Sequence, residues 1–189
     1  MSFKNSFFIP LLFIFACQPV EIISPVEFDN SNFNKISINA KEISIKVSYK
    51  SIFSQENIED QISKTPLEIL ESWLSGNIKN FGNQNKILIN IIDASIFRKE
   101  IKNTSAKKYE EKIIFLYEVF FLVEYELYDD NDYLLANTTV ETYRSTTSNK
   151  YISLNESELI INDLLNNSLK DFTKETDSLL KIYMSEYLY

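Results

Sequence analysis

Two serine–lysine pairs are the first residues of this 189-residue chain whose types and spacing could support catalysis. Ser105 precedes Lys108, and Ser178 precedes Lys181, by three residues, a spacing at which a lysine can activate a serine nucleophile. Neither pair is accompanied by the further motifs that such serine enzymes need, and so short a pattern often arises by chance. We therefore predict that neither pair is catalytic.

A group of acidic and amide side chains could instead bind calcium. Asp129, Asn131 and Asp132 offer oxygen ligands. A calcium loop that begins at Asp129 needs glycine at its sixth position and glutamate at its twelfth. Those positions hold Leu134 and Val140. Residues 129–132 are therefore predicted to form a turn and not a metal site.

Three glutamates share one face of a predicted strand, because side chains alternate along a strand. They are Glu118, Glu124 and Glu126. Two carboxylates whose environments separate their pKa values can perform acid–base chemistry, which keeps an envelope hydrolase as a less favoured function. A solvated or partner-facing acidic stripe is the favoured interpretation.

The sequence lacks the commonest catalytic and ligand-binding groups. Histidine is absent, so the usual general base and metal ligand are missing. Gly76 and Gly82 are the only glycines, which excludes a glycine-rich phosphate loop. A formal net charge of −8 without a basic cluster disfavours nucleic acid as a partner. We expect a protein that is not an enzyme and that has no cofactor, metal or nucleic-acid partner.

The first residues have the composition of a targeting segment. Lys4 precedes the apolar stretch 7–16. As a helix this stretch would be roughly 15 Å long, about half the thickness of the bilayer's hydrocarbon core. It therefore predicts a signal peptide and not a membrane span. If cleavage follows Ala16, Ile14 is too large for the −3 position of an ordinary signal-peptidase site.

The residues Ile14-Phe15-Ala16-Cys17 resemble the lipobox of bacterial lipoproteins, with an aliphatic residue at −3, a small one at −1 and cysteine at +1. Phe15 departs from the family pattern, in which the −2 residue is usually small. The resemblance implies a signal peptide at 1–16 and lipidation of Cys17, whose acyl chains would anchor the protein in a membrane. Gln18 at +2 implies the periplasmic face of the outer membrane, with the inner membrane as an alternative. A buried free thiol is the other interpretation of Cys17.

Two regions follow the signal peptide. Residues 17–35 contain proline, asparagine and serine without hydrophobic periodicity, which predicts a flexible lipidated tether. Residues 36–189 are predicted to form a single domain. Because Cys17 is the only cysteine, this domain has no internal disulfide and depends on packing for its stability.

Hydrophobic periodicity predicts an α+β fold for the domain, in the order β-α-β-β-β-α. We expect an antiparallel sheet of about four strands packed by two helices, the C-terminal helix being long. Strands are predicted at 36–53, 87–97, 112–128 and 133–146. Helices are predicted at 66–81 and 156–188. The continuous apolar run at 87–97 predicts burial on both faces of that strand.

Capping signals mark the starts of both predicted helices. Thr65 with Glu68, and Ser153 with Glu156, have the spacing of a capping box. Gly76 weakens the last turns of the first helix, so that helix could end early.

The predicted strand 112–128 carries more large apolar side chains than one helix-covered face requires. They include Phe115, Leu116, Phe120, Phe121 and Leu122. Helices or a second protomer could cover both faces of this strand. Alternatively, the excess could form a groove for acyl chains or an interface with a membrane complex.

The lipobox, the tether and this order of elements resemble two families of periplasmic lipoproteins. One is the lipopolysaccharide-assembly lipoprotein that plugs an outer-membrane barrel, and the other is the auxiliary lipoprotein of ABC-type lipid transporters. In the second family the first helix carries a tryptophan, as Trp73 does within residues 71–75. The resemblance implies a non-enzymatic accessory of envelope transport or assembly, with a transporter subunit or an outer-membrane barrel as its partner. A structural envelope lipoprotein without cargo is the alternative.

Overall fold

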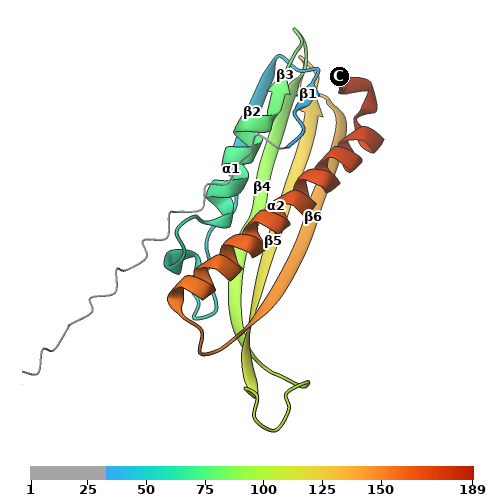
Figure 1. Ribbon diagram of the computed structural model, residues 1–189. Coiled ribbons are helices and arrows are strands. Elements are labelled where there is room, and N and C mark those ends of the chain that lie inside the picture. Colours follow the sequence, from blue (N-terminus) through green and yellow to red (C-terminus); the bar gives the residue numbers. More distant parts are fainter. Residues whose placement is uncertain (1–32) are drawn as a thin grey trace, which may run out of the picture.

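The computed structural model describes residues 33–189. The predicted signal peptide 1–16, Cys17 and most of the predicted tether 17–35 lie outside the described residues. A four-stranded sheet is covered on one face by two helices, the second of them long (Figure 1). This arrangement confirms the predicted α+β fold.

The large sheet has the strand order β2-β4-β5-β6. Its strands are β2 (Glu42–Val47), β4 (Lys86–Lys102), β5 (Ile113–Tyr128) and β6 (Leu134–Asn149). The last three form an antiparallel meander, whereas β2 runs parallel to β4. Parallel neighbours need a crossover connection, which here contains the helix α1 (Pro66–Asn77). The sheet is therefore antiparallel except at its β2 edge.

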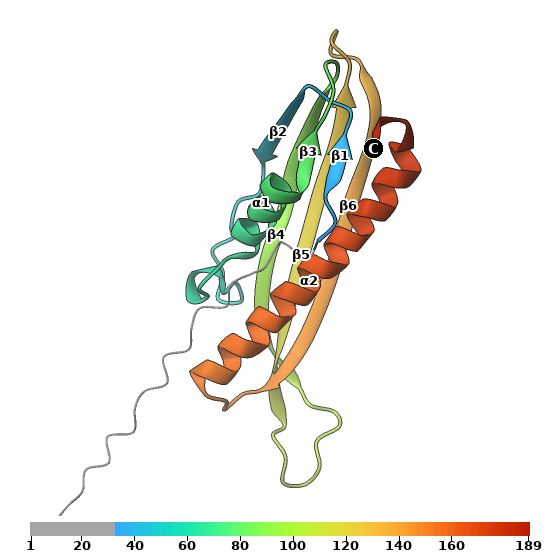
Figure 2. The same ribbon diagram turned by 45° about the horizontal axis from the view of Figure 1, so that its top comes forward.

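Two short strands form a second, smaller sheet. β1 (Ile36–Ile38) pairs in parallel with β3 (Ile78–Asn80). β1 also contacts the end of the chain, because the amide of Tyr189 donates to the carbonyl of Ser37 at 3.1 Å. The C-terminus consequently lies beside β1 (Figure 2). The single strand predicted at 36–53 is therefore wrong, because this segment contains two strands that belong to two different sheets.

Both helices begin at the predicted capping boxes. In α1, the Thr65 hydroxyl accepts the backbone N–H of Glu68, and the Glu68 carboxylate accepts the backbone N–H of Thr65. The same reciprocal bonds join Ser153 and Glu156 at the start of α2 (Leu154–Tyr183). Each box satisfies N–H groups that a helix N-terminus otherwise leaves without partners.

The first helix is shorter than its apolar spacing predicted. α1 ends at Asn77, directly after Gly76, and the chain continues as β3. Glycine is about 1 kcal/mol less favourable than alanine inside a helix. As part of β3, Ile78 gains a strand partner in β1 and its side chain is buried. Pairing in the small sheet therefore outweighs the helical periodicity.

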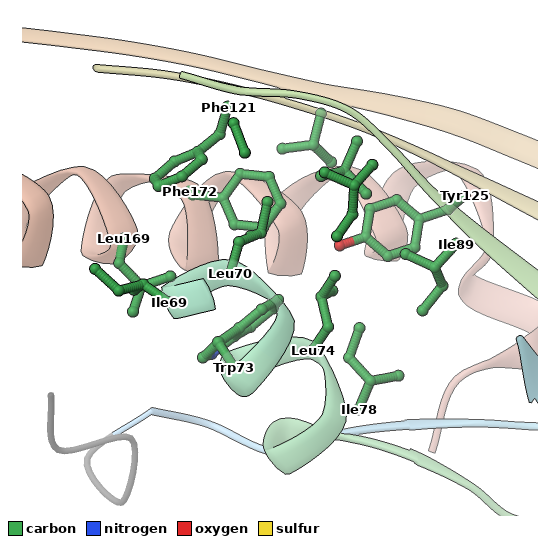
Figure 3. Packing of buried hydrophobic residues seen from close by; sticks show 14 of the residues in the cluster. Ile69, Leu70, Trp73, Leu74, Ile78, Ile89, Phe121, Tyr125, Leu169 and Phe172 are labelled. Atoms are coloured by element: carbon green, nitrogen blue, oxygen red, sulfur yellow. The ribbon is translucent and has the colours of Figure 1, made fainter. Parts of the chain in front are cut away.

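The core lies between the two helices and one face of the large sheet (Figure 3). β5 contributes alternate buried residues, which are Tyr117, Val119, Phe121, Val123, Tyr125 and Leu127. Phe172 of α2 joins the layers, since its ring centroid lies 5.7 Å from that of Trp73 and 5.6 Å from that of Phe121. Such edge-to-face ring contacts add to the stabilisation from burial. Trp73 is therefore a core residue.

A β-bulge explains the continuous apolar run in β4. The β4–β5 register shifts between Ile91 and Asp93. Before the shift, odd-numbered residues such as Ile91 face the helices, and after it even-numbered residues such as Ile96 do so. Ile92, at the bulge, is 38% exposed. The predicted burial of 87–97 on both faces is therefore wrong, because a change of phase on one buried face produces the same sequence pattern.

Candidate interaction site

The face of β4, β5 and β6 turned away from the helices is here named the open face. Both helices lie on the other side of the sheet (Figures 1 and 2), and no helix or strand of residues 33–189 lies over the open face. β5 contributes to it Leu116, Glu118, Phe120, Leu122, Glu124 and Glu126, all of them half-buried. Of the interpretations of the apolar excess, cover by the chain's own helices on both faces is thus wrong.

An aromatic row crosses the open face and consists of Phe97, Phe120 and Tyr143. These residues come from β4, β5 and β6 respectively. The ring centroids of Phe97 and Phe120 are 6.3 Å apart, and those of Phe120 and Tyr143 are 4.9 Å apart. Tyr143 is 51% exposed. The row therefore offers ring surface at the middle of a sheet face that no other element of residues 33–189 covers.

Charge at the aromatic row is neutralised within the chain. The Glu118 carboxylate forms an ion pair with the Lys99 ammonium at 2.9 Å and accepts the Tyr143 hydroxyl at 2.8 Å. The Lys99 ammonium beside Glu118, followed by the Tyr143 hydroxyl, lowers the pKa of this carboxyl group although partial burial acts in the opposite direction. The carboxylate is thus ionised and paired at neutral pH. It serves as an anchor for Tyr143 and not as a proton donor.

The open face becomes acidic away from the aromatic row. Glu124 and Glu126 on β5 and Glu141 on β6 share this face, because Glu124 pairs with Thr139 and Leu122 pairs with Glu141. None of the three glutamates has an ion-pair partner among residues 33–189. The open face is thus apolar at its centre and carries unpaired negative charge at one end. Such a surface attracts a basic partner and repels anionic headgroups.

The two serine–lysine pairs lie apart from this site. Ser105 and Lys108 are in the exposed connection between β4 and β5, where the Lys108 ammonium sits 5.7 Å from the ring centroid of Tyr109. Ser178 and Lys181 are exposed on α2, and Lys181 forms an ion pair with Asp177 at 2.6 Å. The lysines are engaged elsewhere, so the geometry supports neither serine as a nucleophile.

Residues 129–132 form the predicted turn. One oxygen of Asp129 accepts the backbone N–H groups of Asn131 and Tyr133, each at 2.8 Å. Hydrogen bonds from these backbone groups, the one from Tyr133 being the stronger cause, lower the pKa of Asp129. Asp130 and Asp132 pair with lysines of the neighbouring segments. In the part of the chain that the structure describes, no acidic cluster could hold a metal ion.

The sequence identified Glu118 and Phe120 but not their partners Phe97, Lys99 and Tyr143. These contacts depend on the strand register, which sets Phe97 opposite Glu118 and Phe120 opposite Tyr143. The bulge at Ile92 decides which β4 residues reach the open face, and the amino-acid pattern does not signal it.

Neither helix of residues 33–189 combines the length and apolarity needed to cross a bilayer.

No protein-family model matches the chain, and no curated protein matches it. Among solved structures it is similar to a minor lipoprotein from Acinetobacter baumannii, at 11% identity and a TM-score of 0.40, over 74% of this chain and 89% of that one. It is also similar to rare lipoprotein B from Shewanella oneidensis, at 13% identity and a TM-score of 0.41, over 75% of this chain and 96% of that one. At TM-scores this low, neither likeness carries a conclusion about function.

Proposed function

We propose that the chain is a non-enzymatic, lipid-anchored accessory protein of an envelope transport or assembly complex that handles lipid or lipopolysaccharide. Cys17 is its proposed lipidation site, and the periplasmic face of the outer membrane is its proposed location. The observation that carries the proposal is the open face, where an aromatic row remains without a covering layer in residues 33–189.

The chemistry of the open face favours a protein partner over catalysis. Aromatic side chains at the centre of a surface and charges at its edge are typical of protein interfaces. The carboxylate nearest the centre, Glu118, has a lowered pKa, whereas a general acid of a hydrolase needs a raised one. An unpaired acidic end formed by Glu124, Glu126 and Glu141 favours a basic surface on the partner.

A photo-crosslinking experiment tests the proposed partner. Tyr143 is replaced by p-benzoylphenylalanine in the full chain, which keeps an aromatic ring at this position. Lys170, exposed on the outward side of α2, receives the same group as a matched control. We expect Tyr143 alone to crosslink to a transporter subunit or outer-membrane barrel protein in cells. Crosslinks only to a second copy of the chain, or none, would contradict the accessory role.

The location is tested independently through Cys17→Ser. We expect this variant to leave the envelope fraction, because the acyl chains provide the anchor. Equal sedimentation of the variant and the unaltered chain with membranes would show that lipidation of Cys17 does not hold the protein there.

A further inference from the structure

A cavity of about 530 Å³ lies on the helix-covered side of the sheet, at the end of the core where α2 begins. Three parts of the chain enclose it: residues 58–63, which include the short 3-10 helix η2 (Glu59–Gln61), Arg98 of β4, and the first turns of α2. Its volume lies within the range of small-ligand sites, about 300–1,000 Å³. Because it lies across the sheet from the open face, it is a separate candidate site.

One part of the cavity wall is aliphatic. Ile58 is fully buried and Ile161 is 7% exposed, so both belong to the floor of the cavity. Leu154, in contrast, is 88% exposed and stands at the rim. A buried aliphatic floor and an exposed leucine at the rim suit a ligand with a hydrocarbon portion.

Two polar groups of the wall have unused hydrogen-bonding capacity. The Arg98 guanidinium lies 4.9 Å from the ring centroid of Phe115 and forms no ion pair within residues 33–189. Asn162 lines the cavity and is 6% exposed as a residue, and no hydrogen bond joins its side-chain amide to another residue of 33–189. The atoms of this amide are not themselves buried, so the amide is accessible from the cavity. An acceptor group bound in the cavity would satisfy both donors.

Two carboxylates also line the cavity, Asp60 on η2 and Glu158 on α2. They oppose entry of a purely anionic ligand, whereas Arg98 opposes a purely cationic one. A ligand that carries both charges meets each of them with a complementary group.

We propose that this cavity binds a zwitterionic amphiphile with the chemistry of a phosphatidylethanolamine. Its phosphate contacts Arg98 and Asn162, its ammonium contacts Asp60 or Glu158, and its aliphatic portion lies against the isoleucine floor. This ligand class is consistent with the proposed lipid-handling role. That the ligand comes from the envelope membrane rests on the proposed function.

Native mass spectrometry of the full chain in detergent tests the site with dioctanoyl phosphatidylethanolamine as the probe. We expect one bound lipid per chain, and weakening of about tenfold or more in Arg98→Met, which keeps the aliphatic stem and loses the charged hydrogen bonds. Asn162→Leu is expected to weaken binding, because it removes the amide that lines the cavity. Lys102→Met, an exposed cation at the end of the same strand, is the matched control and leaves binding unchanged.

Dioctanoyl phosphatidylglycerol, which lacks the ammonium, separates the charge requirement from hydrophobic adsorption. Equal binding of the two lipids, no binding of the first, or binding unchanged in both Arg98→Met and Asn162→Leu would overturn the assignment. Circular dichroism verifies that each variant is folded. Lipid binding in the cavity together with failed crosslinking at Tyr143 would refute the accessory role and support the cavity site. Crosslinking at Tyr143 without lipid binding would support the accessory role and refute the cavity site.

Discussion

Both faces of β5 carry large apolar side chains, but only the open face also carries glutamates, and the two faces have different environments. On the covered face, Phe121 and its alternate neighbours are buried against α1 and α2. On the open face, Phe120 is half-buried, and the side chains around it include a paired carboxylate. The presence of large apolar side chains therefore does not by itself distinguish a core face from an interaction face. The distinction comes from what packs over the strand and from how nearby charges are paired.

Truncation of a core ring should show the largest difference between the faces. Phe172→Ala removes the ring that contacts both Trp73 and Phe121, and we expect the free energy of unfolding to fall by about 3–5 kcal/mol. Phe120→Ala on the open face should cost much less, since no helix of residues 33–189 packs over its ring. Urea unfolding of the full chain measures both. Equal losses would mean that the open face also works as a core.

Loss of a helix cap should have the next largest effect and should weaken the covered face alone. Ser153→Ala removes the hydroxyl that accepts the Glu156 backbone N–H at 3.2 Å. We expect a loss of about 1 kcal/mol in unfolding free energy, measured by thermal unfolding. Ser178→Ala, at an exposed position within the same helix, serves as control and should change little.

The ion pair on the open face predicts a smaller, pH-dependent effect. Because Lys99 lowers the folded-state pKa of Glu118, the pair stabilises the fold fully above the unfolded pKa of about 4.3. This contribution disappears as the pH falls through the lower folded-state pKa.

Glu118→Gln should accordingly lose less stability than the unaltered chain between about pH 5 and pH 3. Glu124→Gln, which removes a carboxylate without an ion-pair partner among residues 33–189, is the control. Identical acid profiles for Glu118→Gln and the unaltered chain, measured by urea unfolding at each pH, would show that the pair contributes nothing.

Replacement of the exposed ring should have a small effect on stability and a large one on binding. Tyr143→Ser removes the ring contact with Phe120 and the hydrogen bond to Glu118. We expect it to lower the unfolding free energy by about 1 kcal/mol and to abolish recovery of the proposed membrane partner in affinity purification. Thr139→Ser, on the same strand and also exposed, should retain that partner. Undiminished recovery with Tyr143→Ser would exclude the aromatic row from the interface.

Local signals in the sequence predicted much of the fold, whereas contacts between segments distant in the sequence could not be predicted from it. The capping pairs at Thr65 and Ser153 and the turn at Asp129 depend on neighbours within a few residues, so their spacing predicted them. Ile78 was assigned to the wrong element because its strand partner, Ile36, is distant in sequence. The aromatic row and the cavity at Arg98 both join segments whose proximity depends on strand register and helix docking, which no local pattern encodes.

The position of β1 has a mechanical consequence. It is the first strand after the proposed tether, and it is bonded to β3 and to the C-terminal residue Tyr189. Tension transmitted from a membrane-held Cys17 would reach β1 before any other element. A load along a strand is shared by its lateral hydrogen bonds, so the last residue of the chain helps to resist extraction of the first strand.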